Sequence, residues 1–235
     1  MQMIVDRNER IIGAEALTRW QNQEKGLLSP GVFIEPLKSA GLIDKLDFYI
    51  LEEACKQLEQ WNRTGKGHLW LSCNFTRLTV SRSDFAERFQ DVLGRYQFPH
   101  NCLIIELTED SLMDNTTVTY SNILACKKMG CQIALDDLGN GYSSLQDLCD
   151  YPIDMIKIDR HILLKFVTPR GNALLQGLTK LGHKMGMKVV CEGVESENEK
   201  QRVHEAGCDY IQGFYYSCVL PRDEVDLFYM RKQKT

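Results

Sequence analysis

Long hydrophobic runs are absent from this chain. No apolar stretch approaches the roughly 18 residues that a membrane-spanning helix requires. Residues 1–6 show neither the basic nor the apolar region of a signal peptide. We therefore expect a cytoplasmic protein that makes no direct contact with a membrane.

A basic excess is also missing, and so is any clustering of cysteine or histidine. The chain has 28 Lys and Arg against 32 Asp and Glu, a net charge of −4, which argues against a binder of polymeric nucleic acid. The nine cysteines contain no C-x-x-C pair and the five histidines show no ligand spacing, which disfavours zinc. We expect reduced, mostly buried thiols, because several cysteines lie in apolar runs, namely Cys73, Cys102, Cys131 and Cys191.

What the sequence does contain is an alternation of strand-like and helix-like segments. Residues 2–6 and 10–18 are apolar runs whose short link cannot form a parallel crossover, so they predict an antiparallel hairpin. Further apolar runs predict strands at 69–74, 103–109, 132–135, 154–159, 188–195 and 209–213. Helical spacing and capping residues predict helices at 30–40, 44–63, 84–96, 115–129, 170–185, 196–206 and 222–232.

This alternation indicates the fold class. Eight strands interleaved with helices over 235 residues favour an α/β protein of the TIM-like (β/α)₈ barrel type over an open doubly wound sheet. The hairpin makes the first strand of that barrel antiparallel. No linker or low-complexity segment divides the chain, so we expect one domain over residues 1–235.

Polar residues end the predicted strands from the second onward. In chain order they are Glu15, Asn74, Glu106, Asp136 with Asp137, Lys157 with Asp159, Glu192 with Glu195, and Gln212. Taken singly, each fits an ordinary solvated strand end, and the paired aspartates fit an acidic turn. The carboxyl ends of barrel strands meet at one mouth, however, where active sites lie. The sequence therefore predicts an acidic cluster at that mouth.

Such a cluster would be unfavourable without cations. Two carboxylates ~5 Å apart repel by about 3 kcal/mol at an effective dielectric constant of ~20, and Lys157 is the one conspicuous basic group in the set. Either several of the acids are protonated or cations lie among them. Carboxylate and amide oxygens suit Mg²⁺, Mn²⁺ or Ca²⁺ better than Zn²⁺. Asp136 beside Asp137 could bridge two ions of the kind that promote phosphoryl displacement.

Seven segments together resemble the EAL domain, the cyclic di-GMP phosphodiesterase module of bacteria, over essentially the whole chain. They are Glu15-Ala16-Leu17-Thr18-Arg19-Trp20, Asn74 in C-N-F-T, Glu106-Leu107-Thr108-Glu109, Asp136-Asp137 with G-x-G-Y-S-S-L, Lys157-Ile158-Asp159, Glu192-Gly193-Val194-Glu195, and Gln212-Gly213. Each motif is weak alone, but their order and intervals are specific. The resemblance implies hydrolysis of cyclic di-GMP to linear pGpG with two Mg²⁺ or Mn²⁺ ions in a barrel with an antiparallel first strand.

The resemblance also implies residue roles. Ligands of one ion would be Glu15, Asn74, Glu106 and Asp136, and ligands of the second Asp136, Asp137 and Glu192. Lys157 would hold the nucleophilic water or a phosphate oxygen. Glu192 and Glu195 would have further catalytic roles, and Glu195 and Gln212 would act near the metals. Substrate contacts are implied for Leu17, Arg19, Gln212 and Asp159, with Arg19 meeting a phosphate. Support of the loop after Asp137 is implied for Glu109, Gly139, Gly141 and Ser143.

Alternatives stay open on the residues alone. Arg19 could pair with a surface acid instead of a phosphate. Leu138 and Asn140 stand where the family usually has Phe and Thr, which leaves rate and regulation open although no ligand is lost. The rival functions are a non-hydrolysing receptor for cyclic di-GMP or a partner protein, and a phosphodiesterase for another cyclic dinucleotide. The resemblance further implies a homodimer, and fusion to a sensor or GGDEF domain in a longer signalling protein from which this domain is excised.

Overall fold

Eight strands of the chain close into a barrel in the order β1-β10-β9-β8-β7-β6-β5-β2. The computed structural model describes residues 1–108, 117–138, 147–165 and 168–232. The barrel strands are β1 (Gln2–Asp6), β2 (Ile11–Ala16), β5 (Trp70–Phe75), β6 (Leu103–Thr108), β7 (Gln132–Leu138), β8 (Met155–Ile158), β9 (Lys188–Cys191) and β10 (Tyr210–Gln212). The predicted (β/α)₈ barrel is confirmed.

The first strand is the exception to a parallel barrel. β1 runs antiparallel to both of its neighbours, β2 and β10, whereas every other neighbouring pair is parallel. The link from residue 7 to residue 10 is too short for a crossover, which explains the reversal. The predicted hairpin is therefore confirmed.

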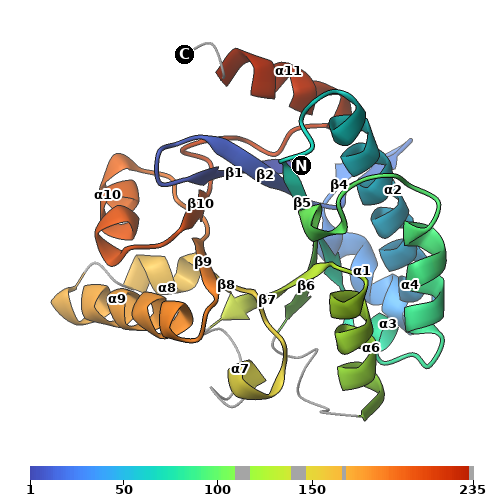
Figure 1. Ribbon diagram of the computed structural model, residues 1–235. Helices are drawn as coiled ribbons and strands as arrows, with labels where there is room; N and C mark the ends of the chain where they lie inside the picture. Colours follow the sequence, from blue (N-terminus) through green and yellow to red (C-terminus); the bar gives the residue numbers. More distant parts are fainter. Residues whose placement is uncertain (109–116, 139–146, 166–167, 233–235) are drawn as a thin grey trace.

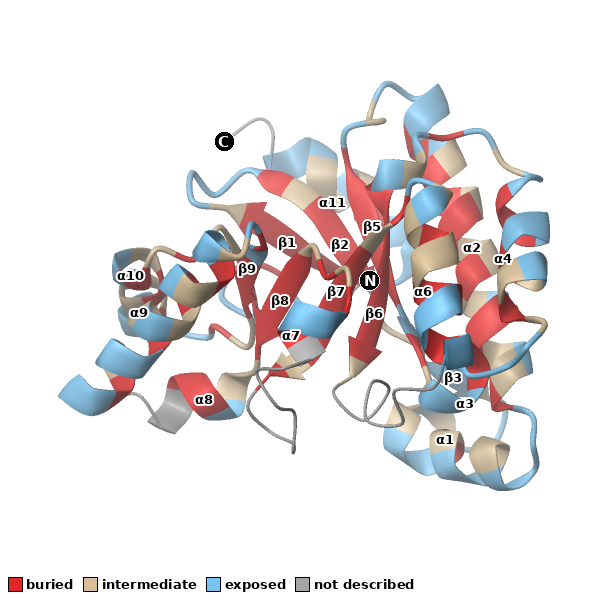
Figure 2. Ribbon diagram, turned by 60° about the horizontal axis from the view of Figure 1, so that its bottom comes forward, coloured by how far each residue is buried: buried red, intermediate tan, exposed pale blue. Residues whose placement is uncertain are grey.

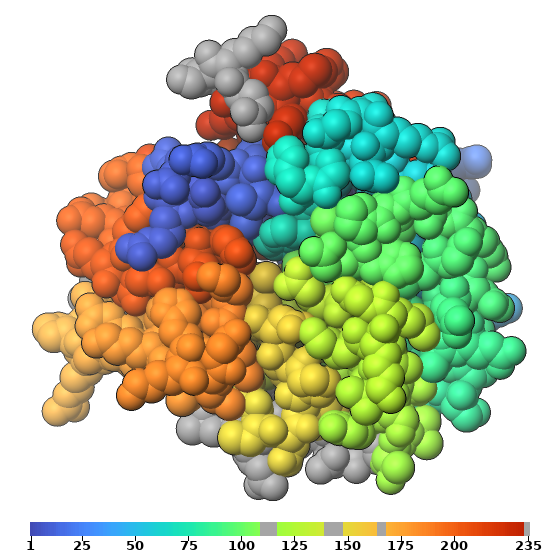
Figure 3. Space-filling model, in the orientation of Figure 1, coloured from blue at the N-terminus to red at the C-terminus, as the bar shows by residue number. Residues whose placement is uncertain are grey.

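Helices surround the barrel (Figure 1). In Figure 3 the colours follow one another around the molecule in chain order, as expected when each unit packs beside the next. The helices are α1 (Pro30–Ser39), α2 (Ile43–Arg63), α3 (Arg77–Val80), α4 (Phe85–Leu93), η1 (His100–Cys102), α6 (Thr117–Lys128), α7 (Asp147–Asp150), α8 (Arg160–Lys165), α9 (Pro169–Lys184), α10 (Glu197–Ala206) and α11 (Arg222–Lys232). Among the described residues, none of these helices combines the length and apolar character needed to span a bilayer.

The core lies on both faces of the strands, which are buried almost throughout (Figure 2). On β5, Phe75 packs edge-on against Phe48 of α2 and thus faces the helices. Alternation then directs Trp70 and Asn74 into the barrel. Trp70 lies directly over Gly13, where an added Cβ would come within 2.4 Å of Trp70 Cδ2. Glycine at position 13 therefore admits the ring into the barrel interior.

The short helices α3, η1, α7 and α8 are not expected from the sequence, and three features of the strands also differ from expectation. β7 continues to Leu138, which pairs with Ile158 after a register shift. β9 ends at Cys191, because Gly193 adopts a left-handed conformation with φ +68° and ends the extended run. A short hairpin of β3 (Trp20–Asn22) and β4 (Gly26–Leu28) was not predicted, since two three-residue strands carry too little pattern. None of the nine cysteines, all of which lie among the described residues, forms a disulfide, and seven of them are buried, as expected.

Candidate active site

The carboxyl ends of the strands bring acidic side chains together at one mouth. Glu15 of β2, Glu106 of β6 and Asp136 of β7 each place a carboxylate oxygen within 4.8 Å of the other two. All three side chains are buried. The register explains part of this convergence, because Asn74 pairs with Glu106 across β5 and β6.

Lys157 of β8 lies in the middle of these acids and is fully buried. Its Nζ is 2.8 Å from Glu106 Oε1, 3.2 Å from Glu15 Oε2, 3.6 Å from Asp136 Oδ1 and 2.6 Å from Glu192 Oε1. These contacts are ion pairs. One ammonium thus faces four carboxyl groups, which leaves the cluster short of positive charge.

Two side-chain amides hold the glutamates in place. Asn74 Nδ2 donates to Glu15 Oε1 at 2.9 Å and to Glu106 Oε2 at 3.0 Å. Gln212 Nε2 donates to Glu15 Oε2 at 2.8 Å and to Gln2 Oε1 at 3.1 Å. Within the described residues, Gln212 Oε1 is buried and has no hydrogen-bond partner. It is therefore an acceptor still open to a ligand or water.

Gln2 is a site residue that the sequence reasoning missed. Its Nε2 donates to the Ser217 carbonyl at 3.1 Å, which turns its Oε1 toward Gln212. Gln2 lies opposite Glu15 in the register of the first hairpin. The hairpin register could have revealed it, because a polar residue paired with Glu15 must share the barrel interior.

The acids of the cluster differ in the direction in which their pKa values are shifted. Burial and then the charge of Glu15 raise the pKa of Glu106 well above its usual range. Burial opposes ionisation of Glu15, yet Lys157 and hydrogen bonds such as that from Gln212 hold its pKa below its usual value. Burial raises the pKa of Asp136, and it raises that of Glu192 to about 8 although Lys157 opposes it. Without a divalent cation the cluster therefore retains protons at neutral pH.

The donor set fits a divalent cation. Three carboxylates and an amide converge. Among the described residues, no cysteine or histidine takes part in the cluster of Glu15, Glu106 and Asp136. Sites made of such oxygen ligands suit Mg²⁺ or Mn²⁺. A cation there would replace the protons and offset the excess negative charge. The residues present thus match the group that the sequence resemblance implies.

The acids at the edge of the cluster are placed by backbone geometry. Asp137 has φ +59°, and its N–H donates to Asp136 Oδ1 at 2.8 Å. Glu192 is the first residue beyond β9, and its N–H donates to the Ile158 carbonyl at 3.0 Å. This bond aligns Glu192 with the end of the strand that carries Lys157.

Other implied residues lie apart from the cluster contacts. Both carboxylate oxygens of Glu195 accept hydrogen bonds from Arg160. Asp159 Oδ1 accepts from the His161 N–H at 2.7 Å, and exposed Arg19 donates to the Thr18 carbonyl at 2.7 Å. Leu17 lines a cavity of about 630 Å³ that also reaches Asn74. Glu109, Gly139, Gly141 and Ser143 lie outside the described residues.

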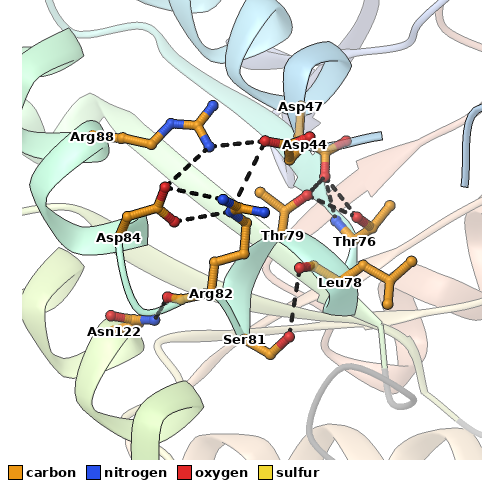
Figure 4. A network of polar contacts seen from close by, with 10 residues as sticks. All are labelled: Asp44, Asp47, Thr76, Leu78, Thr79, Ser81, Arg82, Asp84, Arg88 and Asn122. Carbon is orange, nitrogen blue, oxygen red and sulfur yellow. Dashed lines mark hydrogen bonds and ion pairs between the residues drawn. The ribbon is translucent and has the colours of Figure 1, made fainter. Parts of the chain in front are cut away.

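A polar network supports the segment that follows Asn74 (Figure 4). Buried Asp47 of α2 accepts three hydrogen bonds at Oδ2, from Thr76 N at 3.0 Å, Thr76 Oγ1 at 2.7 Å and Thr79 Oγ1 at 2.6 Å. These bonds fix the turn two residues beyond Asn74. In the sequence, the signal for this role is an acid on the buried face of the predicted helix 44–63.

The fold and the site define a class of protein. An eight-stranded α/β barrel gathers carboxylates and amides around a buried lysine at the carboxyl ends of its strands, a site suited to divalent cations. Residues 2–218 match the EAL domain, and the chain belongs to the EAL domain family.

Named relatives agree with this assignment. The signaling protein YkoW of Bacillus subtilis is 33% identical over 223 residues, which cover 94% of this chain and 28% of YkoW. The cyclic di-GMP phosphodiesterase RocR of Pseudomonas aeruginosa is 31% identical over 212 residues, which cover 90% of this chain and 54% of RocR. The chain spans about a third of the length of several such relatives.

Solved structures show the same fold. The phosphodiesterase of MucR from Pseudomonas aeruginosa, in complex with c-di-GMP, superposes with a TM-score of 0.89 at 30% identity. The match covers 95% of this chain and 92% of that one.

Proposed function

We propose that this chain hydrolyses cyclic di-GMP to linear pGpG in a metal-dependent reaction. The observation that carries the proposal is the convergence of Glu15, Asn74, Glu106 and Asp136 on Lys157, in a chain of the EAL domain family. The names of RocR, a cyclic di-GMP phosphodiesterase, and of the MucR phosphodiesterase complex support the choice of substrate.

Two Mg²⁺ or Mn²⁺ ions are part of the proposal. Glu15, Asn74, Glu106 and Asp136 would hold one ion, and Asp136, Asp137 and Glu192 the other. When bound, such ions lower the pKa of a water molecule and offset charge on the phosphodiester. The excess of acids over ammonium groups in the cluster supports cation binding.

The side chains of the cluster have complementary tasks in this mechanism. Burial lowers the pKa of Lys157, but the surrounding carboxylates raise it further, so Lys157 keeps its proton. Its ammonium group is then available to a phosphate oxygen or to the attacking water. Glu192, whose Oε1 lies 2.6 Å from Lys157 Nζ, would act beside Lys157 while it holds the second ion. Gln212 Oε1 is a buried acceptor that can orient water.

Substrate contacts would come from the rim. Arg19 is exposed and its guanidinium could meet a phosphate, while Leu17 lines the cavity beside Asn74 and Asp159 follows the Lys157 strand. Glu195 would act through the ion pair that it forms with Arg160. Glu109, Gly139, Gly141 and Ser143 stay predictions for loop support.

Turnover tests the proposal directly. The purified chain is incubated with cyclic di-GMP and Mg²⁺ or Mn²⁺, and linear pGpG is quantified by chromatography. Glu15→Gln should abolish nearly all product, whereas Glu87→Gln on the exposed surface of α4 should not. Tight binding without product at any metal concentration would establish the receptor alternative, and faster cleavage of another cyclic dinucleotide would change the substrate.

The cellular setting is proposed on the same basis. MucR is named a bifunctional diguanylate cyclase and phosphodiesterase, which supports fusion of this domain to a sensor or GGDEF domain. A cytoplasmic location is part of the proposal. A homodimer is the expected assembly, and light scattering of the purified chain measures it.

A further inference from the structure

Arg160 binds the segment that carries Glu192. Arg160 is the first residue of α8, two residues beyond the end of β8. Its Nη1 and Nη2 donate to the two carboxylate oxygens of Glu195, one to each. This two-point contact fixes orientation as well as distance, because the planar fork of the guanidinium matches the carboxylate.

The stem of Arg160 packs on the same segment. Gly193 has φ +68°, and a Cβ added there would lie 2.5 Å from Arg160 Cβ, 2.6 Å from Cγ and 2.8 Å from Cδ. The stem therefore occupies the space that a side chain at position 193 would need. Glycine is required here for both its left-handed conformation and this close approach.

Backbone bonds complete the attachment of residues 192–195. The Glu192 N–H donates to the Ile158 carbonyl at 3.0 Å, and the Val194 N–H donates to the Gln212 carbonyl at 3.1 Å. At the far end, Glu199 Oε2 accepts from the Glu195 N–H at 2.7 Å. The segment is thus tied to the ends of β8 and β10 and to the first turn of α10.

The pair is poorly explained as a stabilising device. The side chains of Arg160 and Glu195 are 37% and 33% exposed, and ion pairs that open to water add little stability. Its position is informative instead. It bridges the ends of β8 and β9, which supply Lys157 and Glu192, whose Nζ and Oε1 are 2.6 Å apart.

From this geometry we infer that Arg160 is a positioning residue, which through Glu195 and Gly193 holds Glu192 in place for cation binding. The inference rests on the proposed function for its catalytic consequence, but the positioning itself does not require turnover. Removal of a group that orients a metal ligand without touching the metal lowers metal affinity by about 10- to 100-fold.

The test compares Arg160→Met with Arg222→Met. Met keeps the aliphatic stem beside Gly193 and removes the fork. Arg222 is a matched control, since it also begins a helix and pairs with Glu53 at 38% and 31% side-chain exposure. Mn²⁺ binding is measured by calorimetry, and hydrogen exchange of residues 192–195 is measured in the metal-free protein.

In Arg160→Met we expect one Mn²⁺ binding event to weaken about 10-fold or more, with the other nearly unchanged. The amides of residues 192–195 should exchange faster, and the melting temperature should match that of Arg222→Met. Activity should return toward the wild-type value as Mn²⁺ is raised, because the fault lies in affinity. Arg160→Lys, which retains the charge and loses the planar two-point fork, should fall between the wild type and Arg160→Met.

Wild-type Mn²⁺ affinity and wild-type exchange in Arg160→Met would overturn the inference. If that variant does not fold, Glu195→Gln reports on the same contact with the same two readouts. Wild-type protein that binds Mn²⁺ and releases no pGpG would refute the proposed function, while the comparison of the two arginine variants would still decide the role of Arg160.

Discussion

Replacing Lys157 with Met removes the one cation that the described residues place among the acids at the mouth. Its Nζ lies 2.6 to 3.6 Å from four carboxyl oxygens, and its side chain is 1% exposed. Removing one partner of a buried ion pair leaves uncompensated charge and costs about 3–5 kcal/mol. We expect a loss of that size in the free energy of unfolding of metal-free protein at about pH 8.

The loss should shrink in acid. The pKa of Glu192 is about 8 in the folded protein against an ordinary value of 4.5, so between these values the folded state binds more protons than the unfolded state. Folded-state stability from this group is therefore lost as pH rises through that range. At about pH 5.5 Glu192 is protonated in the folded protein, so removal of Lys157 leaves less uncompensated negative charge, and about 1–3 kcal/mol should remain, the cost of unsatisfied buried polar groups.

Urea unfolding of the wild type and the variant in the presence of a chelator, at both pH values, measures this difference. Lys38→Met serves as the control, because Lys38 pairs with the exposed Glu35 on the surface and should change stability by less than about 1 kcal/mol. An equal loss at the two pH values would refute the reasoning, since it would show that Lys157 stabilises the barrel by packing and not by charge.

Three further predictions concern Glu192, Asp47 and Gly13. Mn²⁺ affinity should increase between about pH 6 and about pH 8.5, because the ion competes with protons for Glu192. Calorimetry in two buffers of different ionisation enthalpy counts the protons that Mn²⁺ binding releases. Asp47→Ala should lower the free energy of unfolding by about 1–3 kcal/mol in urea, because three donors lose their acceptor. Gly13→Ala should cost about 1–3 kcal/mol or more through its clash with Trp70, whereas Gly31→Ala, in open space on a helix, should be neutral or stabilising by thermal unfolding.

Each of these has a contrary result. A Mn²⁺ affinity that does not change with pH would mean that the acids hold no protons for the ion to displace. Wild-type stability in Asp47→Ala would mean that the turn after Asn74 is fixed by other contacts. Equal melting temperatures for Gly13→Ala and Gly31→Ala would mean that both the ring and the backbone carbonyl of Trp70 can move aside.

The sequence by itself determined the architecture and the acids at the mouth. Apolar runs of strand length alternate with helical periodicity, and a short link forces the first pair of strands to be antiparallel, so the barrel could be predicted from local patterns. Polar residues that close each apolar run mark the strand ends, and barrel geometry places those ends together. Glu15, Asn74, Glu106 and Asp136 could be grouped for that reason.

Only the tertiary structure decided which of these groups touch and how they are supported. Lys157 meets four carboxyl groups, Gln2 orients Gln212, and Glu195 binds Arg160. These contacts join strands and loops that are distant in the chain, and they depend on register and barrel closure, which local pattern does not carry. Burial, the charge of Lys157 and side-chain hydrogen bonds, which all depend on closure, set the pKa values of the acids. The sequence therefore names the acids of the mouth, and the closed barrel determines their protonation and their positions.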